Sequence, residues 1–211
     1  MHDPRFAVWG ITGPIGSGKT TLAGILTGFG AVNLEVDQVG HTVLTRPGIQ
    51  QRLARIFGPS ILREDGGIDR RRLGELAFAS SEATASLNRV MHPAMNREVE
   101  ELLEEEHRKG APLVLVNAAL LYTMGLDRLC QVILYVRAPD LMRLNRIVST
   151  RGLPVELARV RLLAQDREPV DDGRVIFCDN DRTLQELDSW IRFRLGPLLP
   201  ESMRAGMENR A

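Results

Sequence analysis

Residues 13 to 20 read Gly-Pro-Ile-Gly-Ser-Gly-Lys-Thr and match the pattern G-x-x-x-x-G-K-[ST] in full. In such a segment the glycines let a loop close around phosphate groups, with backbone N–H groups pointing inward. Lys19 would reach the terminal phosphates, and the hydroxyl of Thr20 would bind Mg²⁺. The pattern therefore predicts a nucleoside triphosphate site, formed by Gly13, Pro14, Ile15, Gly16, Ser17, Gly18, Lys19, Thr20 and Thr21.

The flanking residues supply the elements that such a loop needs. Phe6–Thr12 is a mostly apolar run with the length of a buried strand, and 20–27 has the pattern of a helix whose N-terminus would face the phosphates. Only two of the 27 lysine and arginine residues are lysines, which singles out Lys19. The order of the glycines also differs from the G-x-G-x-x-G of dinucleotide-binding loops.

Composition narrows the classes of function. The 211 residues carry no net charge, which gives no electrostatic case for a nucleic-acid or membrane partner. Cys130 and Cys178 lie far apart in apolar surroundings and are expected to be buried free thiols. The longest apolar stretch, 113–122, is too short to span a bilayer, and the chain runs directly into its first strand without room for a cleaved signal. We expect a cytoplasmic protein, as a monomer or small homo-oligomer.

Short apolar runs alternate with helical stretches along the chain. Buried parallel strands are predicted at Phe6–Thr12, Ala31–Val36, Leu113–Asn117 and Val132–Val136, with a weaker fifth at Val175–Cys178. This alternation predicts an α/β fold, a parallel sheet flanked by helices, with ligands bound beyond the carboxyl ends of the strands.

The interval from Gly40 to Gly110 contains no convincing strand, and its apolar residues recur at helical spacing. It is predicted to be a helical insertion with breaks at 47–48, 58–59, 65–67 and Pro93, and to provide an acceptor pocket. The acidic run within 98–109 is expected to be the solvated face of a helix rather than a metal site. Two helical stretches are predicted in 141–163, with Pro154 opening the second, and a final amphipathic helix in 183–195.

A phosphate loop serves GTPases, motor ATPases and kinases, so the residues that follow it must discriminate. A kinase of a hydroxyl compound needs a carboxylate that orients the hydroxyl and accepts its proton. Glu35-Val36-Asp37 is predicted to end the second strand at the edge where the loop lies. Strand alternation would place Glu35 and Asp37 on one side. A merely polar strand end remains the alternative.

The order of motifs resembles the dephospho-CoA kinase family over roughly residues 6 to 195. Beyond the phosphate loop, the resemblance is carried by Asp37, Phe57-Gly58, Ile61-Leu62, Asp65-Gly66, Ile68-Asp69-Arg70-Arg71, Leu73, Phe78, His92-Pro93, Leu120-Leu121, Arg146, Ala164-Gln165 and Asp179-Asn180. The family transfers the γ-phosphate of ATP to the ribose 3′-hydroxyl of dephospho-CoA, the last step of coenzyme A biosynthesis.

The resemblance implies a role for each matching residue. Asp37 would be the general base, Lys19 and Thr20 would hold phosphate and Mg²⁺, and Arg146 would stabilise the transferring phosphoryl group from a mobile lid. Asn180 would lie near the adenine of ATP. The acceptor-binding residues would be Asp37, His41, Arg70, Arg71 and His92, with a helix-capping role as the alternative for His92 and an anchoring role for the two arginines.

The resemblance also implies a division into parts within a three-layer α/β/α fold of the P-loop class, with a five-stranded parallel sheet. The nucleotide-binding core would comprise 1–40, 111–142 and 168–196, the acceptor subdomain 41–110 and the lid 143–167. The prolyl and polar composition of 197–211 predicts a flexible tail.

Several positions depart from the family pattern, among them Pro14 in the phosphate loop and His41 in place of an arginine. Asn117 and Thr123 stand where many relatives have carboxylates, and Glu35 replaces an aspartate. Asn117 can bind a metal-bound water but brings no negative charge. Magnesium would then rest on Thr20, the ATP oxygens and Asp37.

Two other functions stay open at this point. A P-loop kinase of another nucleoside, nucleotide or small alcohol would share the sheet, loop and lid but have a different acceptor region. A nucleotide-binding regulator without transfer activity would explain Asn117 and Thr123, whereas the retained Asp37 and Arg146 favour an enzyme. A GTPase is disfavoured because the chain has no Asn-Lys-x-Asp segment.

Overall fold

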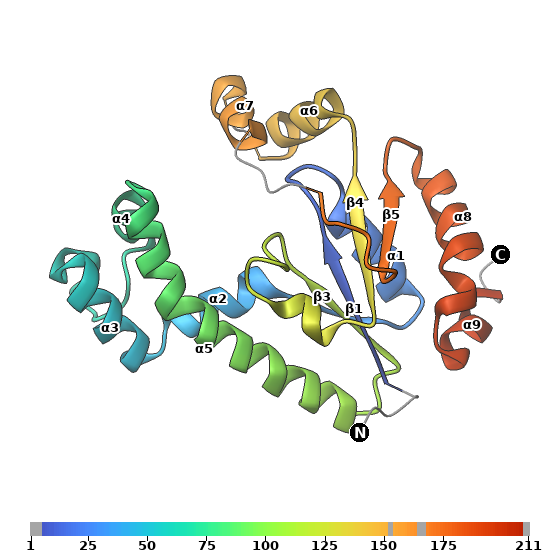
Figure 1. Ribbon diagram of the computed structural model, residues 1–211, viewed down its shortest axis with the longest axis horizontal. Coiled ribbons are helices and arrows are strands. Elements are labelled where there is room, and N and C mark those ends of the chain that lie inside the picture. The colour runs from blue at the N-terminus through green and yellow to red at the C-terminus, as the bar shows by residue number, and fades with distance from the viewer. Residues whose placement is uncertain (1–5, 152–153, 164–167, 209–211) are drawn as a thin grey trace. The chain divides into compact units, whose positions relative to one another are not determined.

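The computed structural model describes residues 6–151, 154–163 and 168–208 (Figure 1). Its sheet consists of β1 (Ala7–Thr12), β2 (Val32–Glu35), β3 (Leu113–Asn117), β4 (Val132–Arg137) and β5 (Val175–Asp179). The strand order is β2-β3-β1-β4-β5, with β1 parallel to both β3 and β4, and β4 parallel to β5. All five predicted strands are confirmed, including the weak fifth one.

The helices connect these strands in the order that the alternating pattern predicts. The α-helices are α1 (Lys19–Gly28), α2 (Val36–Leu44), α3 (Pro47–Phe57), α4 (Arg70–Ala77), α5 (Ser81–Arg108), α6 (Asp140–Arg151), α7 (Val155–Leu163), α8 (Leu184–Arg194) and α9 (Glu201–Glu208). Short 3₁₀ turns occupy η1 (Pro59–Ile61), η2 (Leu126–Leu129) and η3 (Gly196–Leu198).

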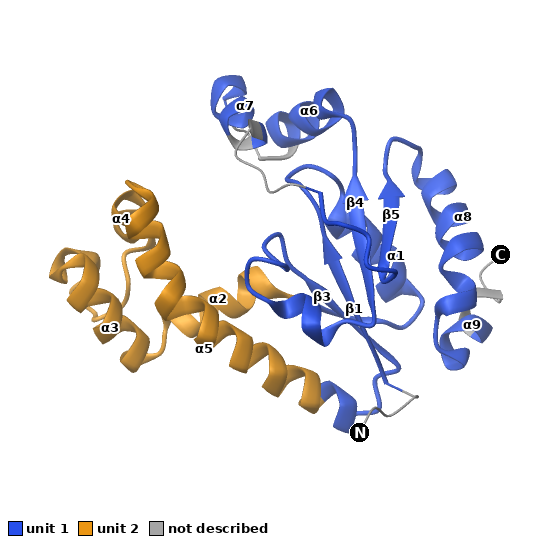
Figure 2. Ribbon diagram, viewed as in Figure 1, with its two compact units in different colours: residues 1–34, 106–211 blue, residues 35–105 orange. Residues whose placement is uncertain are grey.

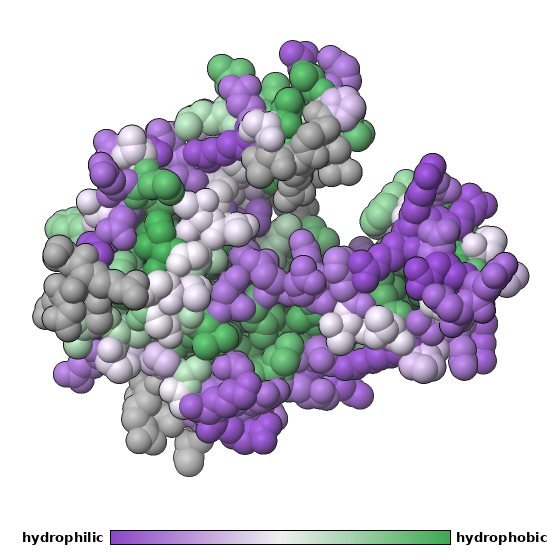
Figure 3. All heavy atoms as spheres, turned by 180° about the vertical axis from the view of Figure 1, so that it is seen from behind, coloured by the Kyte–Doolittle hydropathy of each residue, from purple (hydrophilic) through white to green (hydrophobic). Residues whose placement is uncertain are grey.

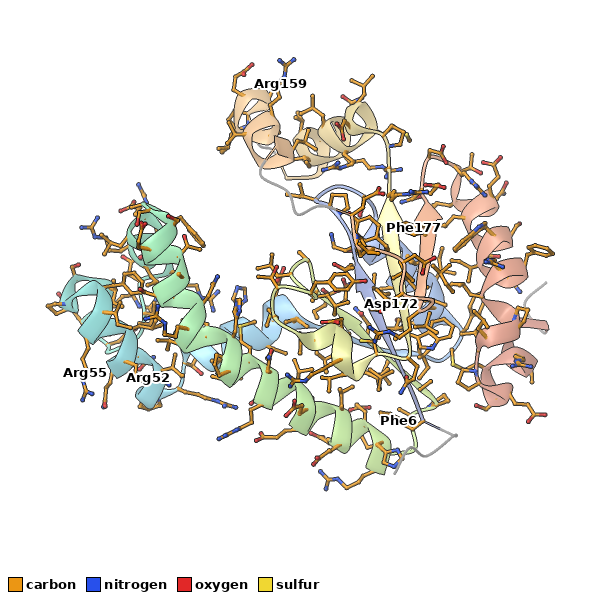
Figure 4. All side chains as sticks on the ribbon, viewed as in Figure 1. Phe6, Arg52, Arg55, Arg159, Asp172 and Phe177 are labelled. Carbon is orange, nitrogen blue, oxygen red and sulfur yellow. The ribbon has the colours of Figure 1, made fainter. Side chains whose placement is uncertain are left out.

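The chain divides into two compact units (Figure 2): unit 1 comprises 1–34 and 106–211, and unit 2 comprises 35–105. Unit 1 contains the central strands of the sheet, and unit 2 is built from helices. The surface of unit 2 is largely hydrophilic, as Figure 3 shows, and Arg52 and Arg55 point into solvent from α3 (Figure 4). Among the described helices, none has both the length and the apolar character to cross a bilayer.

The main core of unit 1 lies between one face of the sheet and helices from both ends of the chain. Trp9 and Leu115 from the sheet, Leu26 from α1, and Ile191 from α8 are at most 2% exposed within it. Burial of side chains of this size supplies about 1.5–3 kcal/mol each. This packing fixes β1 and α1, and with them both ends of the phosphate loop.

Residues 197–208 differ from the flexible tail that composition suggests. Residues 201–208 form α9, and the side chains of Leu199 and Met203 are buried in the core of unit 1. The helix is amphipathic, but its few apolar residues stand between polar residues and prolines, so the sequence pattern does not indicate a helix there.

Two predictions about helix boundaries are wrong. Val36 and Asp37 belong to α2 rather than to the second strand, because Val36, Val39 and Val43 recur at helical spacing and form a buried face. Pro93 does not break the chain but lies inside α5. Proline removes one helix hydrogen bond, a loss that the buried face of a long helix can offset.

Both cysteines are buried free thiols, as predicted. Burial is the main cause that raises the pKa of Cys130 and of Cys178 to about 12. At about pH 8 the thiolate fraction is then roughly 10⁻⁴. We expect neither cysteine to react with an aromatic disulfide reagent at this pH until the protein is unfolded, when both should react. Rapid reaction of the folded protein would contradict this burial.

Candidate active site

The phosphate loop joins the end of β1 to the start of α1. Gly18 is the N-cap residue of α1 with φ +102°, and no side chain caps the helix. The first turn contains no acidic residue, and the side chains of Thr20 and Thr21 are exposed there. The unsatisfied N–H groups and the positive end of the helix dipole therefore remain available to an anion.

A tight turn shapes the first half of the loop. The N–H of Ser17 donates to the carbonyl of Pro14 (3.2 Å), and Gly16 in the third position of this turn has φ +77°. A positive φ at that position is what a type II turn requires, and glycine adopts it without strain. The Lys19 ammonium lies over the same segment and donates to the carbonyls of Gly13 (2.7 Å) and Pro14 (3.1 Å).

Arg146 on α6 and Asn180, the residue after β5, bind carbonyl oxygens of the loop through their side chains. The Asn180 amide donates to Ser17 O (2.7 Å), and Arg146 Nη1 donates to Gly16 O (3.4 Å) and Ser17 O (3.3 Å). Arg146 Nη2 also donates to the Asn180 carbonyl (3.0 Å). Because a peptide's C=O and N–H point in opposite directions, carbonyls held outward leave the following N–H groups facing the other way.

One further residue on α6 contacts the loop, and the motif analysis missed it. Arg143 Nε donates to Ile15 O (3.0 Å), and its Nη1 donates to Asp140 Oδ1 (2.9 Å). The Arg143 side chain is only 7% exposed, and burial lowers its pKa from the usual arginine value. The spacing of Arg143 and Arg146 on one helix face was the sequence signal that could have revealed it.

Close packing explains two of the loop glycines. A Cβ on Gly16 would lie 2.8 Å from the backbone oxygen of Arg143, and a Cβ on Gly18 would overlap the side-chain amide of Asn180. Both glycines also have positive φ. The loop can therefore keep its contacts with α6 and Asn180 only while these positions lack a side chain.

The other strands bring further polar residues to the carboxyl edge of the sheet. Asn117 ends β3 opposite Ile11 in the register with β1 and is buried, and the Thr12 hydroxyl donates to Ala119 O (3.3 Å). Thr123 follows in an exposed turn segment. The structure thus places Asn117 at the edge of the sheet that carries the loop.

Beside the loop, an ion-pair cluster ties the ends of β4 and β5 together. Arg137 forms a bidentate pair with Asp179 (2.8 and 3.1 Å) and a longer one with Glu168. Its guanidinium also lies over the ring of Phe177, which Figure 4 labels on β5. This cluster fixes the residue before Asn180, whose amide then reaches the loop.

The expected acceptor residues lie in unit 2. Asp37 stands exposed in the first turn of α2, where a carboxylate is favoured by the helix dipole, and His41 is exposed one turn later. Because α2 begins at Val36, Glu35 and Asp37 do not share one side of a strand, which corrects that prediction.

His92 lies on α5 close to α2. It is one turn before Met95, whose methyl group would lie 3.1 Å from a Cβ on Gly40 in α2. Burial lowers the pKa of His92 below its usual value, so its imidazole is neutral at pH 7. A neutral imidazole can bind an acceptor through hydrogen bonds but does not supply positive charge for a phosphate.

Several family-like residues in unit 2 have structural roles. The Asp69 carboxylate caps α4 by accepting from Arg72 N (3.0 Å), and Asp65 closes a turn by accepting from Gly67 N (2.8 Å). The expected acceptor residues Arg70 and Arg71 follow the cap and are exposed, with Arg71 paired to Glu75 on its own helix. Ala164 and Gln165 of the expected lid lie outside the described residues.

The described residues show no cluster of three or more His, Cys, Asp or Glu side chains that could hold a metal ion. Mg²⁺ in nucleotide sites uses one or two protein oxygens together with substrate phosphates and waters. The exposed hydroxyl of Thr20 at the start of α1 is such an oxygen. A single hydroxyl oxygen of this kind fits a metal that arrives with the nucleotide.

A parallel sheet of this order, with a phosphate loop between β1 and α1, defines a P-loop protein of the α/β class. The sequence model of the family described as dephospho-CoA kinase matches residues 7–185. The chain belongs to the dephospho-CoA kinase family.

Relatives of this chain align with it over most of their length. The dephospho-CoA kinase of Dehalococcoides mccartyi is 35% identical over 185 residues, which cover 87% of this chain and 93% of the relative. That of Corynebacterium glutamicum is 36% identical over 184 residues, covering 84% and 90%. The crystal structure of TT1252 from Thermus thermophilus superposes with a TM-score of 0.74 at 33% identity, covering 91% of this chain and 97% of that one.

Proposed function

We propose that this protein transfers the γ-phosphate of ATP to the 3′-hydroxyl of dephospho-CoA, giving CoA and ADP in the cytoplasm. The observation that carries the proposal is the intact phosphate loop in a chain whose family membership extends over residues 7–185. The hydroxyl oxygen attacks the γ-phosphorus, the bond to the β-phosphate oxygen breaks, and the hydroxyl proton passes to a base.

Each candidate residue has a defined part in this reaction. The α1 N-terminus and Lys19 would bind the phosphates, which requires the ammonium to leave Gly13 O and Pro14 O. Asp37 would accept the proton of the acceptor hydroxyl. Mg²⁺, held by Thr20 and the nucleotide, would neutralise phosphate charge.

Arg146 fits its proposed role at the transferring phosphoryl group. Its contacts with Gly16 O and Ser17 O are long, at 3.4 and 3.3 Å, and so are weaker than a typical hydrogen bond. The guanidinium could exchange them for a phosphate oxygen at little cost. Its contact with Asn180 O is shorter and would keep the arginine beside the loop.

An ADP-release assay with ATP and Mg²⁺, run with and without dephospho-CoA, tests the proposal, with the product checked by mass. We expect ADP release that depends on dephospho-CoA, together with a gain of one phosphoryl group. ATP binding without this turnover would contradict the proposed acceptor. Turnover with another nucleoside or small alcohol would then identify a kinase with a different acceptor. Lack of turnover with every acceptor would indicate a nucleotide-binding regulator, the alternative that Asn117 and Thr123 suggest.

A further inference from the structure

The buried guanidinium of Arg143 lies against the outer side of the phosphate loop. Its Nε–H donates to Ile15 O, and its backbone at Cα and O is in contact range of the Gly16 position. Nη2 of Arg143 is buried and has no hydrogen-bond partner among the described residues. Burying a charged group costs free energy because desolvation disfavours its charged form, so we look for an interaction that compensates this cost.

Arg143 binds Ile15 O, the carbonyl oxygen of the central peptide in the loop's turn. Ile15 and Gly16 are the two central residues of the turn that Ser17 N and Pro14 O close. Type I and type II turns differ chiefly by reversal of the central peptide. With Ile15 O bound to Arg143, that peptide's N–H, which belongs to Gly16, points away from α6.

We propose that Arg143 is a positioning residue that holds the Ile15–Gly16 peptide with its N–H available to the phosphates. Glycine permits either orientation of this peptide, so the local sequence does not select one. Without a donor at Ile15 O, the peptide can reverse and present a carbonyl oxygen to the anion. The orientation of this peptide matters more in this loop because Pro14 lacks an N–H that could bind the phosphates. This inference rests on the proposed use of the loop for ATP.

The test compares two ligands that share only the phosphates. Binding of Mg²⁺–ATP and of Mg²⁺–tripolyphosphate is measured by calorimetry for Arg143→Met, in the absence of dephospho-CoA. We expect both affinities to fall in parallel by about tenfold or more, the effect of losing a hydrogen bond from a charged donor. The control is Asp140→Asn, because the Asp140 side chain is 85% exposed and its carboxylate pairs with Arg143. Its Oδ1 is kept, so both affinities should stay within about twofold.

Two outcomes would overturn the inference. A loss confined to ATP would mean that Arg143 contacts the nucleoside through Nη2 instead, and unchanged binding of both ligands would mean that the contact only supports the fold. If Arg143→Met does not fold, Arg143→Lys keeps the charge and most of the stem, and a parallel loss of about threefold is expected. Failure of the dephospho-CoA assay leaves these binding measurements intact, so the two proposals fail separately.

Discussion

Replacing Asp37 by asparagine should lower kcat for dephospho-CoA phosphorylation by about 10²- to 10⁴-fold while ATP binding stays within about twofold. Asparagine keeps the size of the side chain and its place in the first turn of α2 but cannot accept the proton of the acceptor hydroxyl. The phosphate loop lies in a different part of the chain and is unchanged. Steady-state rates together with calorimetric titration of ATP measure the two effects separately.

A second carboxylate of unit 2 provides the control for this substitution. Glu101 is exposed on α5, so Glu101→Gln makes the same change of charge at a surface position. Its kcat should match that of the natural protein. Near-normal turnover of Asp37→Asn would refute the base assignment, and an equal loss in both variants would point to net charge rather than to proton transfer.

Replacing Gly18 by alanine should weaken ATP binding by about 10- to 100-fold. The new Cβ would overlap the Asn180 amide, and the backbone at φ +102° disfavours any residue with a Cβ. Relief of the overlap requires the amide to leave Ser17 O, which releases the carbonyl that it holds outward. Calorimetric binding of ATP to the folded variant measures the loss.

Gly24 is the matched control because it lies in the interior of α1 with open space around its Cα. Gly24→Ala should leave ATP affinity unchanged and stabilise the protein by about 0.5–1 kcal/mol, measured by denaturant unfolding. The double variant Gly18→Ala/Asn180→Ala removes the overlap but not the backbone strain. Because the double variant also lacks the amide that holds Ser17 O, ATP binding should stay weak in it, and full recovery would show that neither strain at Gly18 nor this contact causes the effect.

Local patterns were sufficient to predict the sheet and the phosphate loop. Apolar runs such as Leu113–Asn117 have the length and the Val and Leu content of buried strands, and the helical crossovers between parallel strands bring their carboxyl ends to one edge. The loop could be predicted from its motif because its glycines and Lys19 are consecutive with the start of α1, so the sequence pattern alone specifies the local backbone. The prediction of the second strand's end was wrong because strand and helix periodicity both fit the residues around Val36. The predicted break at Pro93 was wrong because the buried face of a long helix outweighs one proline.

By itself the sequence determined the class of fold and the family, because strand runs, the phosphate-loop motif and the later motifs are each made of residues that are neighbours along the chain. Only the tertiary structure decided that Arg143, Arg146 and Asn180 hold the outer carbonyls of the loop, since these contacts join residues 128 to 163 positions apart. It also decided that Asp69 caps a helix. A motif specifies which N–H groups can bind phosphate, but the orientation of each peptide depends on what packs behind it.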